Sequence, residues 1–107
     1  MSTAPKSEVL KLAEMVSYQI GSVVSRQITK ADTGNVTLFA FDAGQELSEH
    51  TAPFDALVHV LDGEAEIIIS GNPFQLEAGD AIIMPADEPH AVKARGQFKM
   101  LLTMIRA

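Results

Sequence analysis

From residue 22 onward, apolar and polar side chains alternate in short runs, and turn residues separate the runs. Residues 35–42 are the clearest case, because Val36, Leu38 and Ala40 would share one face of a strand. The two phenylalanines of the same run would share the other face. Turn signals built from Gly, Pro, Asn and Asp recur about every eight to twelve residues, which is typical of a sandwich or barrel. The pattern predicts an all-β fold of about eight to ten short antiparallel strands.

The beginning of the chain follows a different pattern. Residues 7–14, with the sequence SEVLKLAE, permit a helical turn or two with Ser7 as the N-cap. An isolated helix of this length is marginal in water, so we expect it to pack on the barrel. The pattern predicts an N-terminal segment over residues 1–21, with a short helix and a strand, followed by a barrel over residues 22–107.

Two runs, Ile67–Ile69 and Met100–Ile105, have no clean alternation of apolar and polar side chains. One face of a barrel strand points inward and the other outward, so a second apolar face needs a cover outside the barrel. The N-terminal segment and a second subunit are the two candidates. We expect a homodimer with Leu57 and His59 in its interface, because a chain of 107 residues has little spare structure with which to cover itself.

Composition narrows the classes of partner. The formal net charge is −6 and no basic cluster occurs, so we expect neither nucleic acid nor a membrane surface as a partner. The chain has no cysteine, which excludes disulfides and thiolate metal sites. It shows no signal peptide and no apolar run near the ~18–20 residues that span a bilayer. These features predict a soluble cytoplasmic protein.

Two motifs carry the chemistry of the chain. Residues 44–63 read GQELSEHTAPFDALVHVLDG, and residues 79–90 read GDAIIMPADEPH. The glycine-to-histidine spacing, the Asp-Gly turn and the proline-to-histidine spacing resemble the two signature motifs of the cupin family. The resemblance covers residues 35–105 and implies a double-stranded β-helix, also called a jelly-roll barrel. It also implies a pocket, because these motifs normally supply three histidines and a glutamate to one metal ion.

Half of that ligand set is replaced in this chain. His50 and His90 stand where the family has its first and last ligands. Ala52 stands at the second histidine position and Ala56 at the glutamate position. In the second motif, Asp87 stands where a glycine is usual. The resemblance therefore implies a reduced metal site at His50 and His90.

Two more residues would join this site in a shifted strand register. Asp55 and His59 share one face of their predicted strand, and Ala56 lies on the other. If the following turn is aligned with the family, the Ala56 face points into the cavity and the other face points outward. A bulge just before the strand would turn Asp55 and His59 inward. We expect the unshifted register and keep a site of His50, His90, His59 and Asp55 as the alternative.

These residues predict a cavity that binds a small molecule and, through the two histidines, one divalent transition metal ion such as Zn, Fe, Ni or Mn. Phe54, Met84, Met100 and Met104 are candidates for its lining, although methionine commonly fills gaps in a core. The alternative function is a metal-free ligand-binding or structural barrel without catalysis. No nucleophile motif or phosphate-binding glycine loop occurs, so the sequence leaves open whether the protein is an enzyme.

Overall fold

The computed structural model describes residues 3–107 and is almost entirely β-structure, which confirms the all-β prediction. Every strand pairing within this range is antiparallel. The elements, in chain order, are a 3-10 turn η1 (Leu12–Glu14) and the strands β1 (Val23–Ala31), β2 (Gly34–Phe41), β3 (Glu46–His50), β4 (Phe54–Asp62), β5 (Glu64–Ile69), β6 (Asn72–Glu77), β7 (Ala81–Met84), β8 (His90–Lys93) and β9 (Phe98–Arg106).

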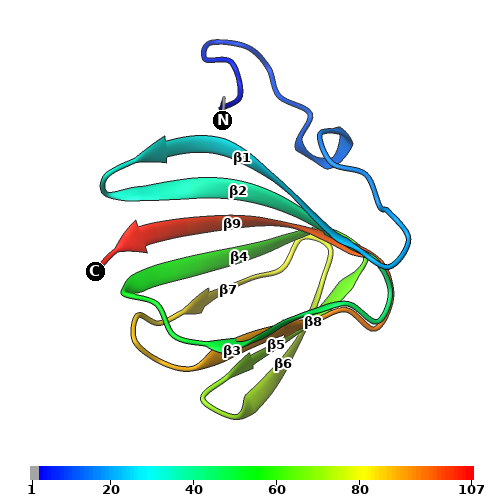
Figure 1. Ribbon diagram of the computed structural model, residues 1–107, viewed down its shortest axis with the longest axis vertical. Coiled ribbons are helices and arrows are strands. Elements are labelled where there is room, and N and C mark those ends of the chain that lie inside the picture. Colours follow the sequence, from blue (N-terminus) through cyan, green and yellow to red (C-terminus); the bar gives the residue numbers. More distant parts are fainter. Residues whose placement is uncertain (1–2) are drawn as a thin grey trace.

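The strands form two sheets that face each other (Figure 1). The five-stranded sheet has the order β1-β2-β9-β4-β7, and the four-stranded sheet has the order β3-β8-β5-β6. The chain passes from one sheet to the other between β2 and β3, and again between β3 and β4. Such crossings between two antiparallel sheets give the jelly-roll barrel that the motifs implied.

The space between the sheets is filled by one large apolar cluster. Alternation along β2 turns Phe39 and Phe41 inward, and Phe41 stacks on Phe98 of β9 with ring centroids 4.4 Å apart. The buried members of this inner cluster are Phe41, Ala56, Val58, Val60, Ala65, Ile67, Ile69, Leu76, Met84, Val92, Ala94, Phe98 and Met100. Because both sheets supply these side chains, the core itself fixes how the sheets face each other.

The helix expected near the N-terminus is reduced to the single turn η1. Ser7 has a φ of +61°, whereas an N-cap residue has an extended backbone, so Ser7 does not cap a helix. Lys11 precedes the turn and makes no side-chain capping bond. The segment is too short to sustain a helix without a cap, and its contacts with the sheet determine its shape instead.

This segment covers part of the outer face of the five-stranded sheet and runs outside β1 in Figure 1. Val16 packs with Leu38 and Ala40 in a second buried cluster, the outer cluster. The Tyr18 hydroxyl donates a hydrogen bond to Asp62 at the end of β4. Burial, followed by this bond and the negative charge of Asp62, raises the pKa of Tyr18. The N-terminal segment therefore supplies part of the outer cover that the sequence required.

The rest of the outer face is uncovered. Leu57 of β4 pairs with Ile83 of β7. Ile105 lies on β9, which neighbours β4 on the other side. Their side chains are 38%, 60% and 59% exposed, respectively. We call these three residues the β4–β7 patch. A second subunit therefore remains a candidate for covering this part of the sheet.

Candidate functional site

The structure brings His50 and His90 together, although 40 positions separate them in the sequence. β3 and β8 are neighbours in the four-stranded sheet, and the two histidines are paired across them. Their Nε2 atoms are 3.2 Å apart, and the rings meet edge to face with their planes at 70°. Both imidazoles therefore present the same nitrogen to one point inside the barrel.

A β-bulge aims His50 at this point. Leu47 pairs with Val92, and His50 pairs with His90, so β3 uses three residue steps where β8 uses two. In a regular strand, residues three apart point to opposite faces. With the extra residue, Leu47 and His50 both line the same cavity. No glycine or proline within Leu47–His50 marks this bulge, so the amino-acid pattern does not predict it.

The hydrogen bonds of the two rings fix where their protons lie. Nδ1 of His50 is 2.8 Å from the carbonyl oxygen of Ser48, and Nδ1 of His90 is 3.2 Å from that of Glu88. A carbonyl oxygen only accepts, so each Nδ1 must carry the hydrogen and donate it. A neutral imidazole has one such hydrogen, so both Nε2 atoms are unprotonated acceptors when the rings are neutral. Two lone pairs then face each other, and a cation between them would satisfy both.

Burial favours the neutral form of His90. Its side chain is 4% exposed, and it lines an apolar cavity. This desolvation, together with the adjacent charge of protonated His50, lowers the pKa of His90, although the bond to the Glu88 carbonyl partly opposes the shift. His50 is an exposed residue at the end of β3, so the pair has one solvent-facing and one buried member. Solvent therefore reaches the site from the His50 side.

The cavity is small and mostly apolar. Its volume is about 50 Å³, enough for a few water molecules. It is lined by the two histidines together with Leu47, Ala56, Met84, Val92, Met100, Leu102 and Met104. Ala56 is paired with Met84 on one side and with Met104 on the other. The position that aligns with the family's glutamate thus lies between two methionines.

Asp55 and His59 do not lie in this cavity. The inner cluster contains Ala56 and Val58, so β4 has the unshifted register and its alternate residues point outward. Oδ1 of Asp55 accepts a hydrogen bond of 2.9 Å from the backbone N–H of Ala86. Its carboxylate therefore holds the loop after β7, and a four-ligand site of His50, His90, His59 and Asp55 does not form.

The family's complete metal set does not fit this site. Across residues 3–107, no group of three or more His, Cys, Asp or Glu side chains is placed to hold an ion. A pair of imidazoles does fit, because 3.2 Å is less than twice the ~2.1 Å of a bond between zinc and an imidazole nitrogen. The site therefore suits an ion that is held by the two imidazole nitrogens and by further donors other than Cys, Asp or Glu side chains.

Two residues near the cavity, Asp87 and Phe54, have roles outside its wall. Asp87 has a φ of +65°, a left-handed conformation in which glycine is unstrained and aspartate is tolerated. Its N–H donates a 2.8 Å hydrogen bond to the carbonyl of Ala52. Phe54, expected as a lining residue, lies instead beneath the Arg106 guanidinium, which is 5.1 Å from its ring centre. It is not part of the cavity wall.

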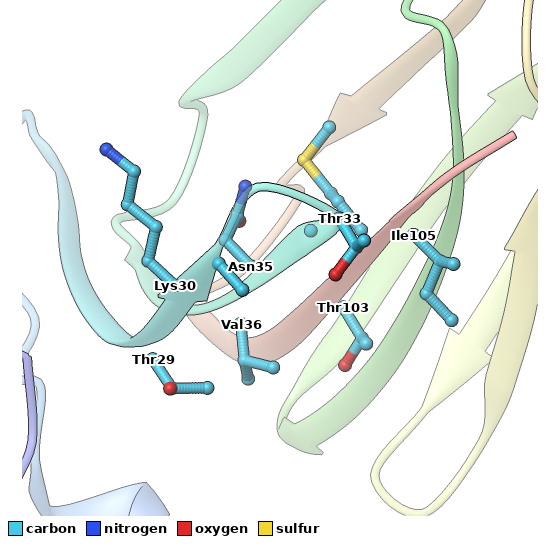
Figure 2. A pocket seen from close by; sticks show the side chains of 10 residues that line it. Thr29, Lys30, Thr33, Asn35, Val36, Thr103 and Ile105 are labelled. Carbon is cyan, nitrogen blue, oxygen red and sulfur yellow. The ribbon is translucent and has the colours of Figure 1, made fainter.

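A larger and more open hollow lies at the end of the β1–β2 hairpin, beside the end of β9. Its volume is about 240 Å³, and Figure 2 shows its lining side chains. Lys30 is the charged residue of this lining as the structure describes it, and its side chain extends away from Thr103 and Ile105. No pair of groups there matches the convergence of the two imidazoles, so the histidine cavity is the better candidate site.

Comparison with known proteins identifies the family of the fold. A family profile described as "Cupin domain" matches residues 37–106. No curated protein matches the chain. A conserved protein of unknown function from Streptococcus pyogenes has a similar solved structure, with 34% identity, a TM-score of 0.91, and coverage of 100% of this chain and 96% of that one.

Two further structures agree with this assignment. A cupin superfamily protein from Desulfitobacterium hafniense has 29% identity and a TM-score of 0.91, with coverage of 99% of this chain and 97% of that one. A cupin 2 conserved barrel domain protein from Leptotrichia buccalis has 41% identity and a TM-score of 0.88. That match covers 91% of this chain and 47% of the longer protein.

Proposed function

The chain belongs to the cupin family, and we propose that its barrel binds one transition metal ion through Nε2 of His50 and His90. A small molecule would reach the ion from the solvent-facing side of His50. The observation that carries this proposal is the convergence of the two Nε2 atoms at 3.2 Å. Each ring is held by a backbone carbonyl at its other nitrogen, which is the usual support of a metal-binding histidine.

The chemistry of the pair favours ions that accept neutral nitrogen donors. Imidazole suits Zn, Ni, Fe and Cu, whereas Mn and Mg prefer oxygen ligands. A bound ion would polarise a carbonyl or carboxylate group of the small molecule. His50 and His90 supply the two nitrogens, and the apolar wall shields the His90 side from bulk water.

A metal-free ligand-binding or structural barrel is the second candidate. Two of the four family ligand positions are Ala52 and Ala56, and the second of these methyl groups lines the cavity. In this account, the imidazoles form hydrogen bonds with water or with an organic ligand. Such a ligand would have to be very small, because the cavity holds only a few water molecules.

Metal titration tests the proposal. Metal-free protein, purified without an affinity tag, would be titrated calorimetrically with Zn(II), Ni(II), Fe(II) and Mn(II). We expect one equivalent of Zn(II) or Ni(II) to bind more tightly than Mn(II), and His50→Ala or His90→Ala to weaken that binding at least about tenfold. His59→Ala is the matched control, since His59 lies on the outer side of β4, and it should leave the affinity unchanged.

Two outcomes would contradict the metal proposal. One is that no ion binds more tightly than about millimolar, the range expected of adventitious surface sites. The other is binding that survives the double replacement of His50 and His90 by alanine. Either result would favour the metal-free barrel.

We also propose that the protein is a cytoplasmic homodimer whose subunits meet at the β4–β7 patch. Leu57, Ile83 and Ile105 support this interface, because they form an exposed apolar surface beside a covered one. Among residues 3–107, no helix is long and apolar enough to span a membrane. The lack of cysteine is compatible with a reducing compartment.

A further inference from the structure

The wall opposite the two histidines is rich in sulfur. The chain contains five methionines, and three of them, Met84, Met100 and Met104, line the cavity that His50 and His90 enter. They come from β7 and β9 of the five-stranded sheet, whereas the histidines come from β3 and β8 of the other sheet. The two sheets thus supply different donor atoms to one small space.

The register places two of these methionines where the family's carboxylate would act. Met84 and Met104 are the cross-strand partners of Ala56, one on each side. All three residues line the cavity, and its volume is only about 50 Å³. Side chains around so small a space lie close to any ion inside it. Thioethers therefore flank the position from which a carboxylate is missing.

The charge balance of the site favours a monovalent ion. None of the residues described as lining this cavity is Asp or Glu, so nothing in the wall offsets a double positive charge. Moving an ion from water into apolar surroundings costs more as its charge rises. Thioether and imidazole donors are neutral, and thioethers select soft ions. A hard divalent ion is therefore disfavoured by both the charge and the donor atoms.

We propose that the cavity is a Cu(I) site in which the Nε2 atoms of His50 and His90 and the thioether sulfurs of Met84 and Met104 are the ligands. This inference rests on the proposed function, because it uses the same two imidazoles. It adds the identity of the ion and the residues that select it. The inner-face methionines are then ligands in addition to filling the core.

The test compares Cu(I) with Zn(II) in protein variants that change sulfur without changing volume. Metal-free protein would be titrated anaerobically with Cu(I) against a chromophoric Cu(I) chelator, and with Zn(II) by calorimetry. Met84→Leu combined with Met104→Leu removes both sulfurs, and exchanges between Met and Leu are usually tolerated in cores. Met15→Leu is the matched control, because Met15 packs against the outer cluster.

We expect the double methionine variant to bind Cu(I) at least about tenfold more weakly and Zn(II) as the unmodified protein does. Met15→Leu should change neither affinity, and His50→Ala should weaken both. X-ray absorption of the Cu(I)-loaded unmodified protein should show sulfur as well as nitrogen in the first coordination shell. This last measurement needs no variant, so it remains decisive if the double variant does not fold.

Two results would overturn the inference. If Cu(I) affinity is the same in the double methionine variant and no sulfur appears around the copper, the methionines are core residues only, while Zn(II) binding would leave the two-histidine proposal intact. If neither Cu(I) nor Zn(II) binds, both proposals are wrong.

Discussion

The two faces of the five-stranded sheet are both apolar, yet the chain covers them to different extents. The inner face meets the four-stranded sheet, and side chains such as Phe41 and Val58 are completely buried there. The outer face is covered by the N-terminal segment over Leu38 and Ala40, but it is open over β4 and β7. An apolar pattern in a strand thus indicates that a face needs a cover, while the length of the remaining chain decides how much of it is covered.

Substitutions on the inner face should lower the free energy of unfolding more than substitutions on the outer face. Phe41→Ala would remove a buried ring that stacks on Phe98, and we expect a loss of about 3–5 kcal/mol in the free energy of unfolding. Phe74→Ala is the matched control, since that ring is 42% exposed on β6 and should matter much less. Urea denaturation of both variants measures the difference. Equal losses would show that the inner cluster does not dominate stability.

Substitutions in the covered half of the outer face should lower the free energy of unfolding by a smaller amount. Val16→Ala would remove apolar surface that the outer cluster buries, at a cost of roughly 1–2 kcal/mol. Val9→Ala is the control, because Val9 is 93% exposed in the same segment and its replacement should be nearly neutral. If the two variants have the same urea midpoint, the N-terminal segment does not contribute to the stability of the barrel.

The open half of the outer face should affect assembly more than folding. Replacing Leu57 and Ile83 by serine would make the β4–β7 patch polar, and we expect the dimer to dissociate at least about tenfold more readily. Serine at the exposed positions Val9 and Ile20 is the control, because these residues lie outside the patch. Analytical ultracentrifugation distinguishes the species. A monomer for the unmodified protein at micromolar concentration would contradict the proposed interface.

The smallest change in stability should come from protonation of His90, which lies between the two sheets. The pKa of His90 is lowered in the folded chain, so the unfolded chain binds the extra proton first as the pH drops below about 6.5. The contribution of His90 to stability is therefore complete above that pH and is lost as the pH falls toward the folded pKa. Urea midpoints of metal-free protein at about pH 5 and about pH 7.5 measure the decline.

His90→Gln should make that decline shallower, because glutamine does not titrate in this range. His59→Gln should leave it unchanged, since its ring lies on the other face of the sheet. An equally steep decline in the His90 variant would mean that other groups cause the acid sensitivity.

The sequence was a good guide wherever the relevant interactions are local. Alternation in β2 correctly assigned Phe39 and Phe41 to one face and Leu38 and Ala40 to the other. The contact between His50 and His90 joins strands 40 positions apart, and it is the family resemblance, not a local pattern, that predicts it. The resemblance also predicted the unshifted register of β4, because the turn after that strand fixes which side chains point inward.

The sequence was a poor guide where distant strands determine the result. Pairing of Met84 and Met104 with Ala56 depends on the registers of β7 and β9 against β4, which no local pattern specifies. The N-terminal segment has a helical composition, but its contacts with the sheet leave only the turn η1. Phe54 looked like a cavity residue by position, yet Arg106 covers its ring. The helix and Phe54 are wrong predictions, and both depend on contacts between segments far apart in the chain, whereas Met84 and Met104 line the cavity as expected.

The bulge in β3 absorbs one residue without changing the face on which the imidazole lies. Deletion of Glu49 would restore regular alternation, so the segment from Leu47 to the histidine would span two steps on both strands. Residues two apart in a regular strand share a face, so the histidine would still enter the cavity beside Leu47. A relative that is one residue shorter here would therefore keep this nitrogen donor, although its spacing from glycine to histidine would differ by one.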